Sequence, residues 1–194
     1  LFCYTTVLRG EKVQSMDIFV GRQPILTQNG DIYAYELLYR NSPDNFFPDV
    51  DADKATIELL VNTFLTIGVD QVVGKSLSFI NFTGTLLVQD LFSSLIPDRV
   101  VIEILEDVEI TPSLLTKIRA LKTDGFKLAL DDFTLREQYV VYEELFRLVD
   151  FIKIDFLNTT ITERNIIETY IKKFPNIQLL AEKIETKEQF NRAK

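Results

Sequence analysis

Residues 77–182 contain five short apolar runs that each carry an acid, an amide or a lysine at or near their end: LSFIN (77–81), VVIE (100–103), LALDD (128–132), FIKID (151–155) and LLAE (179–182). From Asn81 to Glu182, the leading polar residues follow one another at intervals of 22, 28, 22 and 29 residues. One strand, one helix and two short loops need about that length. The polar groups are therefore expected at one rim of one sheet, where such folds carry out chemistry.

A sixth run, IYAYELLYR (32–40), carries Glu36 and Arg40. With residues 16–20 it predicts a β-hairpin, because turn-forming Pro24, Asn29 and Gly30 lie between the two segments. Apolar spacing and end signals then predict alternating helices and strands. The expected helices are 55–68, 83–96, 111–125, 136–149 and 162–174, and the expected strands are 77–82, 99–105, 127–133, 150–156 and 177–184. The expected helix ends are Asp53 and Gly68 for the first helix and Thr111 and Gly125 for the third.

The later strands are apolar on both faces, which is typical of a parallel sheet covered by helices on both sides. A barrel and a doubly wound sheet both fit this pattern. The doubly wound fold usually has a glycine-rich loop after its first strand, and neither GxGxxG nor GKS/T occurs here. The sequence therefore favours an α/β barrel. The side chains expected inside it are Phe79, Asn81, Val101, Glu103, Ala129, Asp131, Phe151, Lys153, Asp155, Leu180 and Glu182.

Composition excludes several classes of protein. The 194-residue chain has a net charge of −8 and no basic stripe, so duplex nucleic acid is not an expected partner. It has no histidine, which excludes His-dependent triads, phosphorelay and zinc sites with His ligands. With Cys3 alone no internal disulfide can form, which favours a reducing, cytoplasmic location. No apolar run reaches the roughly 18 residues of a membrane span. Residues 1–15 are expected to be a non-native or disordered leader, with Met16 as the natural start.

Carboxylate and amide oxygens without Cys or His suit hard cations such as Mg²⁺, Mn²⁺ or Ca²⁺. The candidate ligands are Glu36, Asn81, Glu103, Asp131, Asp132 and Glu182. Gathered in a barrel mouth they would repel one another, and two divalent ions would remove that conflict. Lys153 would then neutralise the site or position a nucleophilic water, and Arg40 could hold a phosphate.

Each of these residues also has a structural interpretation. Asp132 could cap a helix, and Asn81 could be an ordinary loop residue. Lys153 and Asp155 could form a plain ion pair inside the barrel, and Arg40 could lie on the surface. Their coincidence at successive strand ends favours the functional interpretation.

Six motifs in this order resemble those of the EAL-domain family of bacterial cyclic di-GMP phosphodiesterases: YELLYR (35–40), FINFT (79–83), VIEILE (101–106), LALDDF (128–133), FIKID (151–155) and LLAEKIET (179–186). The resemblance extends from residue 16 to the end. Within the family, the chain resembles the branch in which an HDOD domain follows the EAL domain. It implies a TIM-like (β/α)₈ barrel with one antiparallel strand, two Mg²⁺ or Mn²⁺ ions, and hydrolysis of cyclic di-GMP to linear pGpG. A homodimer and a C-terminal HDOD domain are further expectations.

The resemblance also assigns roles to single residues. Glu36, Asn81, Glu103 and Asp131 would bind metal, and Asp132 would bind the second ion. Lys153 would hold the attacking water, Glu182 would act as ligand or base, and Glu106 would organise the loop after LALDDF. Arg40 and Leu38 would contact the substrate.

Several positions depart from the family pattern. Leu37 replaces the small residue of the E-A-L triplet, Leu105 replaces a Thr, and Lys183 stands where a glycine usually follows AE. The segment after LALDDF reads TLREQ rather than a glycine-rich loop, and residues 16–194 are expected to lack the last strands of the barrel. A second hypothesis is therefore a degenerate EAL domain that binds nucleotide or a protein partner without turnover. A third is an unrelated barrel with a structural ion-pair core.

Overall fold

A computed structural model describes residues 6–9, 19–40, 51–89, 91–134, 139–184 and 186–193 of the chain. The strands are β1 (Thr6–Arg9), β2 (Phe19–Leu26), β3 (Ile32–Arg40), β4 (Leu77–Phe82), β5 (Val100–Ile104), β6 (Lys127–Leu130), β7 (Phe151–Asp155) and β8 (Gln178–Glu182). The α-helices are α1 (Ala52–Leu60), α2 (Val69–Val73), α3 (Gly84–Val88), α4 (Pro112–Thr123), α5 (Tyr139–Leu148), α6 (Ile161–Ile171) and α7 (Lys187–Arg192). Shorter elements are the π-helical η1 (Val61–Ile67) and the 3₁₀ turns η2 (Phe92–Ser94) and η3 (Pro97–Arg99).

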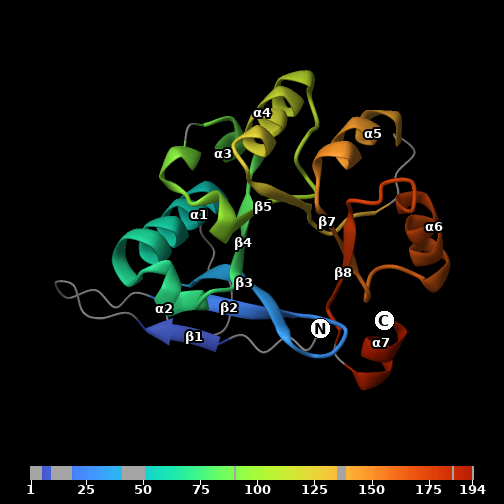
Figure 1. The fold of residues 1–194 in the computed structure, drawn as a ribbon, viewed down its shortest axis with the longest axis horizontal. Helices are drawn as coiled ribbons and strands as arrows, with labels where there is room; N and C mark the ends of the chain where they lie inside the picture. The colour runs from blue at the N-terminus through green and yellow to red at the C-terminus, as the bar shows by residue number, and fades with distance from the viewer. Residues whose placement is uncertain are drawn as a thin grey trace.

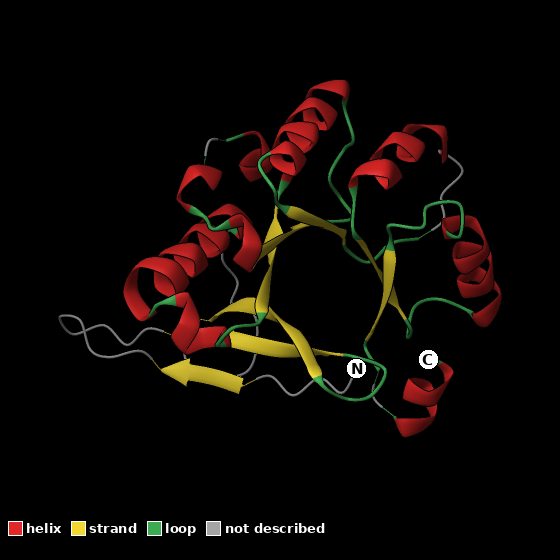
Figure 2. Cartoon of the chain, viewed as in Figure 1, coloured by secondary structure: helices red, strands yellow, loops and turns green. Residues whose placement is uncertain are grey.

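The strands form one sheet in the order β1 to β8. β2 is antiparallel to both β1 and β3, whereas β3 to β8 are parallel neighbours. The sheet curls around a common centre, and α1 and α3 to α6 lie outside it (Figures 1 and 2). Within the described residues β8 pairs with β7 alone, so the barrel is not closed between β8 and β2. The predicted incomplete TIM-like barrel with one antiparallel strand is confirmed.

Helix ends follow local sequence signals. Thr111 caps α4 by accepting a hydrogen bond from the Leu114 N–H, and Pro112 occupies the first turn, as expected. Gly68 ends η1 with a φ of 93°, in the left-handed region that glycine adopts freely. The predicted cap of α1 was wrong by two residues: Asp51 accepts from Lys54 N–H, while Asp53 accepts from the Thr83 hydroxyl.

Two further predictions of local structure were wrong. Pro24 lies within β2 rather than in the hairpin loop, which is limited to residues 27–31. Proline is tolerated on an edge strand, and among the described residues β1 pairs with β2 only as far as Arg22. The single helix predicted for 83–96 is instead the five-residue α3 followed by η2.

Apolar side chains form one layer on each side of the sheet. Outside, Ile80, Ile102, Leu128 and Ile152 belong to the large core that packs against the helices. Inside the barrel is a smaller cluster of Ile25, Ala34, Phe79, Val101, Ala129, Phe151 and Ile184. The rings of Phe79 and Phe151 are 5.2 Å apart. This inner cluster forms the floor below the polar side chains that lie two residues further along the strands.

Thr6–Arg9 pair with Phe19–Arg22, so part of the predicted leader lies at the edge of the sheet. The origin of residues 1–15 stays a prediction. In the described part of the chain, every helix is too short or too polar to cross a bilayer.

Candidate metal and phosphodiester site

Six polar side chains, five on strands and one directly after a strand, meet at the carboxyl end of the barrel. They are Glu36 (β3), Asn81 (β4), Glu103 (β5), Asp131 (directly after β6), Lys153 (β7) and Glu182 (β8). Each lies two residues beyond an inward-facing apolar residue of the same strand, and side chains two apart share a face. The parallel strand pairing places polar residues of neighbouring strands side by side. Asn81, for example, is paired with Glu103 between β4 and β5.

Lys153 lies at the centre of this group. Its Nζ is 2.7 Å from Glu103 Oε1, 2.8 Å from Asp131 Oδ1 and 2.9 Å from Glu182 Oε1. A fourth carboxylate oxygen, Oε2 of Glu36, is 3.6 Å away. The Lys153 and Glu103 side chains are 2% and 0% exposed. We call Lys153, Glu36, Glu103, Asp131 and Glu182 the central cluster.

One ammonium cannot neutralise four carboxylates, and the pKa values reflect the excess negative charge. Burial raises the pKa of Glu103 well above its usual range, and Glu36 and Asp131 raise it further, against the attraction of Lys153. Burial likewise raises the pKa of Glu182 to about 8. Burial alone would lower the pKa of Lys153, but the four surrounding carboxylates raise it well above its usual range. The Lys153 ammonium therefore stays charged, but its single positive charge does not balance the four carboxylates around it.

The donor set fits a hard divalent cation. Asn81 Nδ2 donates to Glu36 Oε1 at 3.3 Å, and the buried Asn81 Oδ1 has no hydrogen-bond partner among the described residues. The buried Oε2 of Glu103 also has none. Leaving a buried oxygen unsatisfied costs about 1–3 kcal/mol, so such atoms need an explanation. Mg²⁺ and Mn²⁺ take carboxylate and amide oxygens as ligands.

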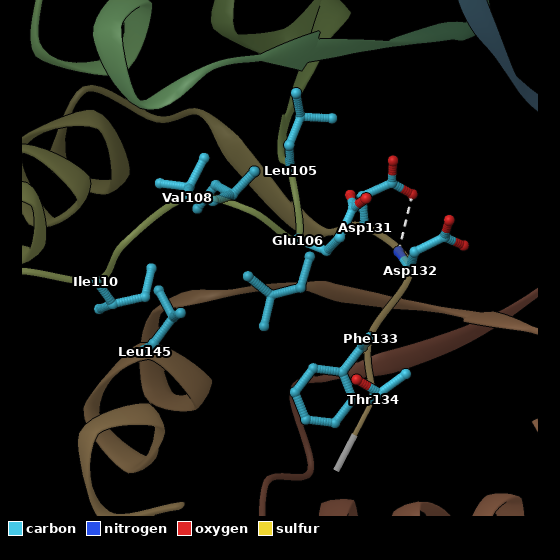
Figure 3. A pocket seen from close by; sticks show the side chains of 11 residues that line it. Leu105, Glu106, Val108, Ile110, Asp131, Asp132, Phe133, Thr134 and Leu145 are labelled. Carbon is cyan, nitrogen blue, oxygen red and sulfur yellow. Dashed lines mark hydrogen bonds between the residues drawn. The ribbon is translucent and has the colours of Figure 1, made fainter. Parts of the chain in front are cut away.

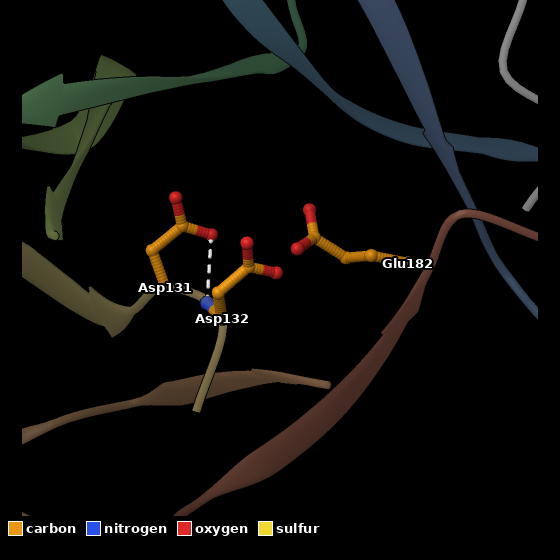
Figure 4. Close-up of side chains that lie close together, drawn as sticks. All are labelled: Asp131, Asp132 and Glu182. Atoms are coloured by element: carbon orange, nitrogen blue, oxygen red, sulfur yellow. Dashed lines mark hydrogen bonds between the residues drawn. The ribbon is translucent and has the colours of Figure 1, made fainter. Parts of the chain in front are cut away.

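A second group of oxygens lies beside the central cluster. Asp131, Asp132 and Glu182 each offer one oxygen, and these three atoms lie within 4.8 Å of one another. Figure 4 shows the three carboxylates facing a common space. Asp132 reaches it because its backbone adopts a φ of 37°, which turns its side chain away from the alternation of the strand. Its N–H donates to Asp131 Oδ1 at 3.0 Å.

The residue after Asp132 anchors this turn. The Phe133 N–H donates to the Lys153 carbonyl, and the buried Phe133 ring packs edge-on against Phe146 of α5. These two contacts of Phe133 fix the turn that carries Asp131 and Asp132 between the inside of the barrel and the helical layer.

Lys183 follows β8 directly and also has a positive φ, of 54°. Its Nζ is 2.5 Å from Asp155 Oδ2 and 3.1 Å from Asp132 Oδ2. Asp155 therefore pairs with Lys183, and the alternative of an Asp155–Lys153 pair does not describe this structure. Burial would lower the pKa of Lys183, but hydrogen bonds to Asp155 and Asp132 raise it above its usual range.

The substrate-contact candidates lie further along β3. Leu38 and Arg40 continue the inward-facing series that begins with Glu36, towards the barrel mouth. Arg40 is buried, and its Nη1 donates to the Tyr39 carbonyl. Leu37 points the other way, into the core between sheet and helices, so this departure from the family pattern lies outside the site.

Glu106 lies apart from the central cluster. It is exposed and lines a small pocket with Leu105, Asp131, Asp132 and Thr134 (Figure 3). The structure therefore brings it beside the turn after β6 that it was expected to organise. Its role there stays a prediction.

Sequence analysis missed Gln23. This residue pairs with Glu36 across β2 and β3 and lines a small cavity with Glu36, Lys153 and Glu182. It was missed because residues 21–31 were assigned to a loop on the strength of Pro24. If Pro24 had been accepted within an edge strand, the alternation of side chains along residues 19–26 would have indicated that Gln23 faces into the barrel.

No protein-family model matches the sequence. The chain is 42% identical over 181 residues to the uncharacterized protein YuxH of Bacillus subtilis, covering 92% of this chain and 44% of that protein. It is 33% identical over 178 residues to the cyclic di-GMP phosphodiesterase CdgJ of Vibrio cholerae, covering 91% of this chain and 40% of that protein. The chain thus spans less than half the length of these two relatives.

Solved structures share the fold. An EAL-domain protein of Listeria monocytogenes aligns with a TM-score of 0.65 and 22% identity, over 89% of this chain and 80% of that one. The Bacillus subtilis YkuI protein, which has an EAL domain and was solved with cyclic di-GMP and calcium, gives the same TM-score and identity over 89% and 50% of the two chains. The chain therefore has the fold of solved EAL-domain structures, the family whose motifs its sequence resembles.

Proposed function

We propose that the chain binds cyclic di-GMP over the carboxyl ends of its strands and hydrolyses one phosphodiester bond, giving linear pGpG in bacterial second-messenger signalling. The observation that carries the proposal is the central cluster together with the adjoining Asn81: within the described part of the chain, Asn81 Oδ1 and Glu103 Oε2 have no hydrogen-bond partner. An excess of buried acid at a barrel rim fits a site completed by divalent cations, which phosphodiester hydrolysis uses. The similarity to CdgJ supports the choice of substrate.

In this proposal Glu36, Asn81, Glu103 and Asp131 hold one Mg²⁺ or Mn²⁺ ion, and Asp132 holds a second. Such ions, when bound, lower the pKa of water and stabilise negative charge on phosphate oxygens. The partnerless oxygens of Asn81 and Glu103 support the first assignment.

The central cluster also supplies proton chemistry. Lys153 remains protonated, so it acts as a hydrogen-bond donor and not as a base. It can orient a water molecule, and Glu182, 2.9 Å from the ammonium, is placed to accept a proton from that water. Arg40, on the same inward face as Glu36, is assigned to a substrate phosphate, and Leu38 between them to a substrate contact. Glu106 is assigned to positioning the turn at Asp132.

The second candidate function is binding of cyclic di-GMP without turnover. The ion pair between Lys183 and Asp132 favours it, because the ammonium takes up part of the charge with which Asp132 would hold a cation. The two candidates share the substrate and differ in the chemical step.

Incubation with cyclic di-GMP and Mn²⁺, followed by chromatography for pGpG, tests the proposal. Glu103→Gln should abolish product, because it removes a buried ligand charge, whereas Glu109→Gln, at an exposed acid after the same strand, should not. Calorimetry with cyclic di-GMP separates the candidates: heat without pGpG supports binding alone. Absence of both heat and pGpG, with and without metal, contradicts both. The homodimer, the HDOD domain and the cytoplasmic location stay predictions.

A further inference from the structure

The structure contains two residues other than glycine with positive φ in its described part, and these two touch. They are Asp132 and Lys183, at the turns after β6 and β8. A lysine in the left-handed region is uncommon and unfavourable, because its Cβ crowds the backbone, whereas glycine adopts this conformation freely. The conformation directs the Lys183 ammonium back over the end of the sheet to Asp132 and Asp155.

Asp155 fixes one end of this contact. Its nearly buried carboxylate accepts hydrogen bonds from the N–H of Leu157 at 2.7 Å, the N–H of Asn158 at 3.0 Å and the Asn158 side chain at 2.6 Å. The 2.5 Å contact from Lys183 adds a fourth donor. Asp155 is therefore a fully engaged anchor that keeps the ammonium in place.

Asp132 is the other end of the contact, and it is shared. Both of its oxygens lie within 3.3 Å of the Lys183 Nζ, while one oxygen also belongs to the group formed with Asp131 and Glu182. A cation bound between those three acids would lie close to a tethered ammonium. Two positive charges on one carboxylate repel each other, and the repulsion is strong where water is partly excluded.

We propose that Lys183 is a built-in counter-ion that occupies the charge of Asp132, so that this chain binds one divalent cation tightly and the second only weakly. The inference rests on the proposed function, because it assumes that Glu36, Asn81, Glu103 and Asp131 bind the first cation. It identifies Lys183 as the residue that sets cation stoichiometry, and it explains why a strained lysine is held beside an acidic group.

The test counts Mn²⁺ ions per chain by calorimetry and by electron paramagnetic resonance, with no substrate present. The wild type should bind one ion tightly. Lys183→Gly removes the ammonium and suits the positive φ, so it should bind a second ion at least tenfold more tightly than the wild type does. Lys183→Asn, which also tolerates this conformation, should behave in the same way and guards against a folding defect of the glycine variant. Lys75→Ala removes an exposed lysine before β4 and should match the wild type.

The outcomes separate the two proposals. Two ions bound equally tightly by wild type and both Lys183 variants overturn the counter-ion role and leave the metal site intact. One tight ion in every variant, with no gain at the second site, also overturns it. No Mn²⁺ bound by any variant contradicts the metal site itself and therefore both proposals. A second ion gained in the Lys183 variants alone supports the inference.

Discussion

Replacing Lys153 by methionine tests the electrostatic description of the barrel mouth most directly. Methionine keeps an unbranched side chain of similar length in a position that is 2% exposed, but it removes the ammonium. Three carboxylates within 2.9 Å of Nζ, and a fourth at 3.6 Å, then lose their counter-charge. The carboxylates are left repelling one another with little access to water.

The size of the effect follows from burial. Removing one partner of a buried ion pair costs about 3–5 kcal/mol, because the remaining charge stays desolvated. Glu103 and Glu182, whose pKa values are already raised, can take up protons and so limit the loss to the lower part of that range. With a urea m-value of about 2–3 kcal/mol/M, a loss of about 3 kcal/mol lowers the midpoint of unfolding by at least ~1 M.

The assay is urea denaturation followed by circular dichroism, in EDTA and in Mn²⁺. Lys122→Met is the matched control: Lys122 pairs with Asp150 at 2.5 Å, but both side chains are partly exposed, so about 0.5–1 kcal/mol is expected. Mn²⁺ should reduce the Lys153→Met deficit by more than half, because the cation replaces the missing positive charge. Equal losses for both variants in EDTA, or a Lys153→Met deficit that Mn²⁺ leaves unchanged, would refute the reasoning.

Three further predictions concern metal, substrate and fold. Mn²⁺ at 100 times its Kd should stabilise the wild type by about 2.7 kcal/mol, and removal with EDTA should reverse this; Glu103→Gln should show almost none of the effect in thermal melts. Arg40→Gln should weaken cyclic di-GMP binding roughly 10- to 100-fold in calorimetry without changing Mn²⁺ affinity, because a charge-assisted contact to phosphate contributes about 1.5–3 kcal/mol; an unchanged Kd would count against that contact. Thr111→Ala should lower the free energy of unfolding by about 0.5–2 kcal/mol through loss of the α4 cap, while Thr116→Ala, on the exposed face of the same helix, should change it by less than ~0.5 kcal/mol in urea denaturation.

Much of the fold could be predicted because its signals are local. The period of strand and helix placed Asn81, Glu103, Asp131, Lys153 and Glu182 at one rim, since parallel strands end on the same side of a sheet. Alternation along each strand separated the inner residues from those that face the helices. Both inferences need no knowledge of distant contacts, and the structure agrees with both.

The parts that failed depend on neighbours distant in sequence. Pro24 argues against a strand unless one knows that the described part of β1, Thr6–Arg9, pairs with β2 only as far as Arg22. The helical periodicity of residues 83–96 did not reveal that α3 ends at Val88. The partner of Asp155 is Lys183 rather than Lys153 because two backbone turns with positive φ bring the ends of β6 and β8 together, and side-chain spacing carries no sign of such turns.

The two lysines of the site make opposite demands on a cation. Lys153 is surrounded by more acid than it can neutralise, so its removal should make the protein depend on metal for stability. Lys183 neutralises an acid that a cation would need, so its removal should increase metal binding without that dependence. If the acids formed only a structural ion-pair core, Mn²⁺ would not stabilise the Lys153 variant, and the Lys183 variant would gain no Mn²⁺ binding. The pair of substitutions, measured in the same Mn²⁺ titration, therefore separates a metal site from an ion-pair core without requiring turnover.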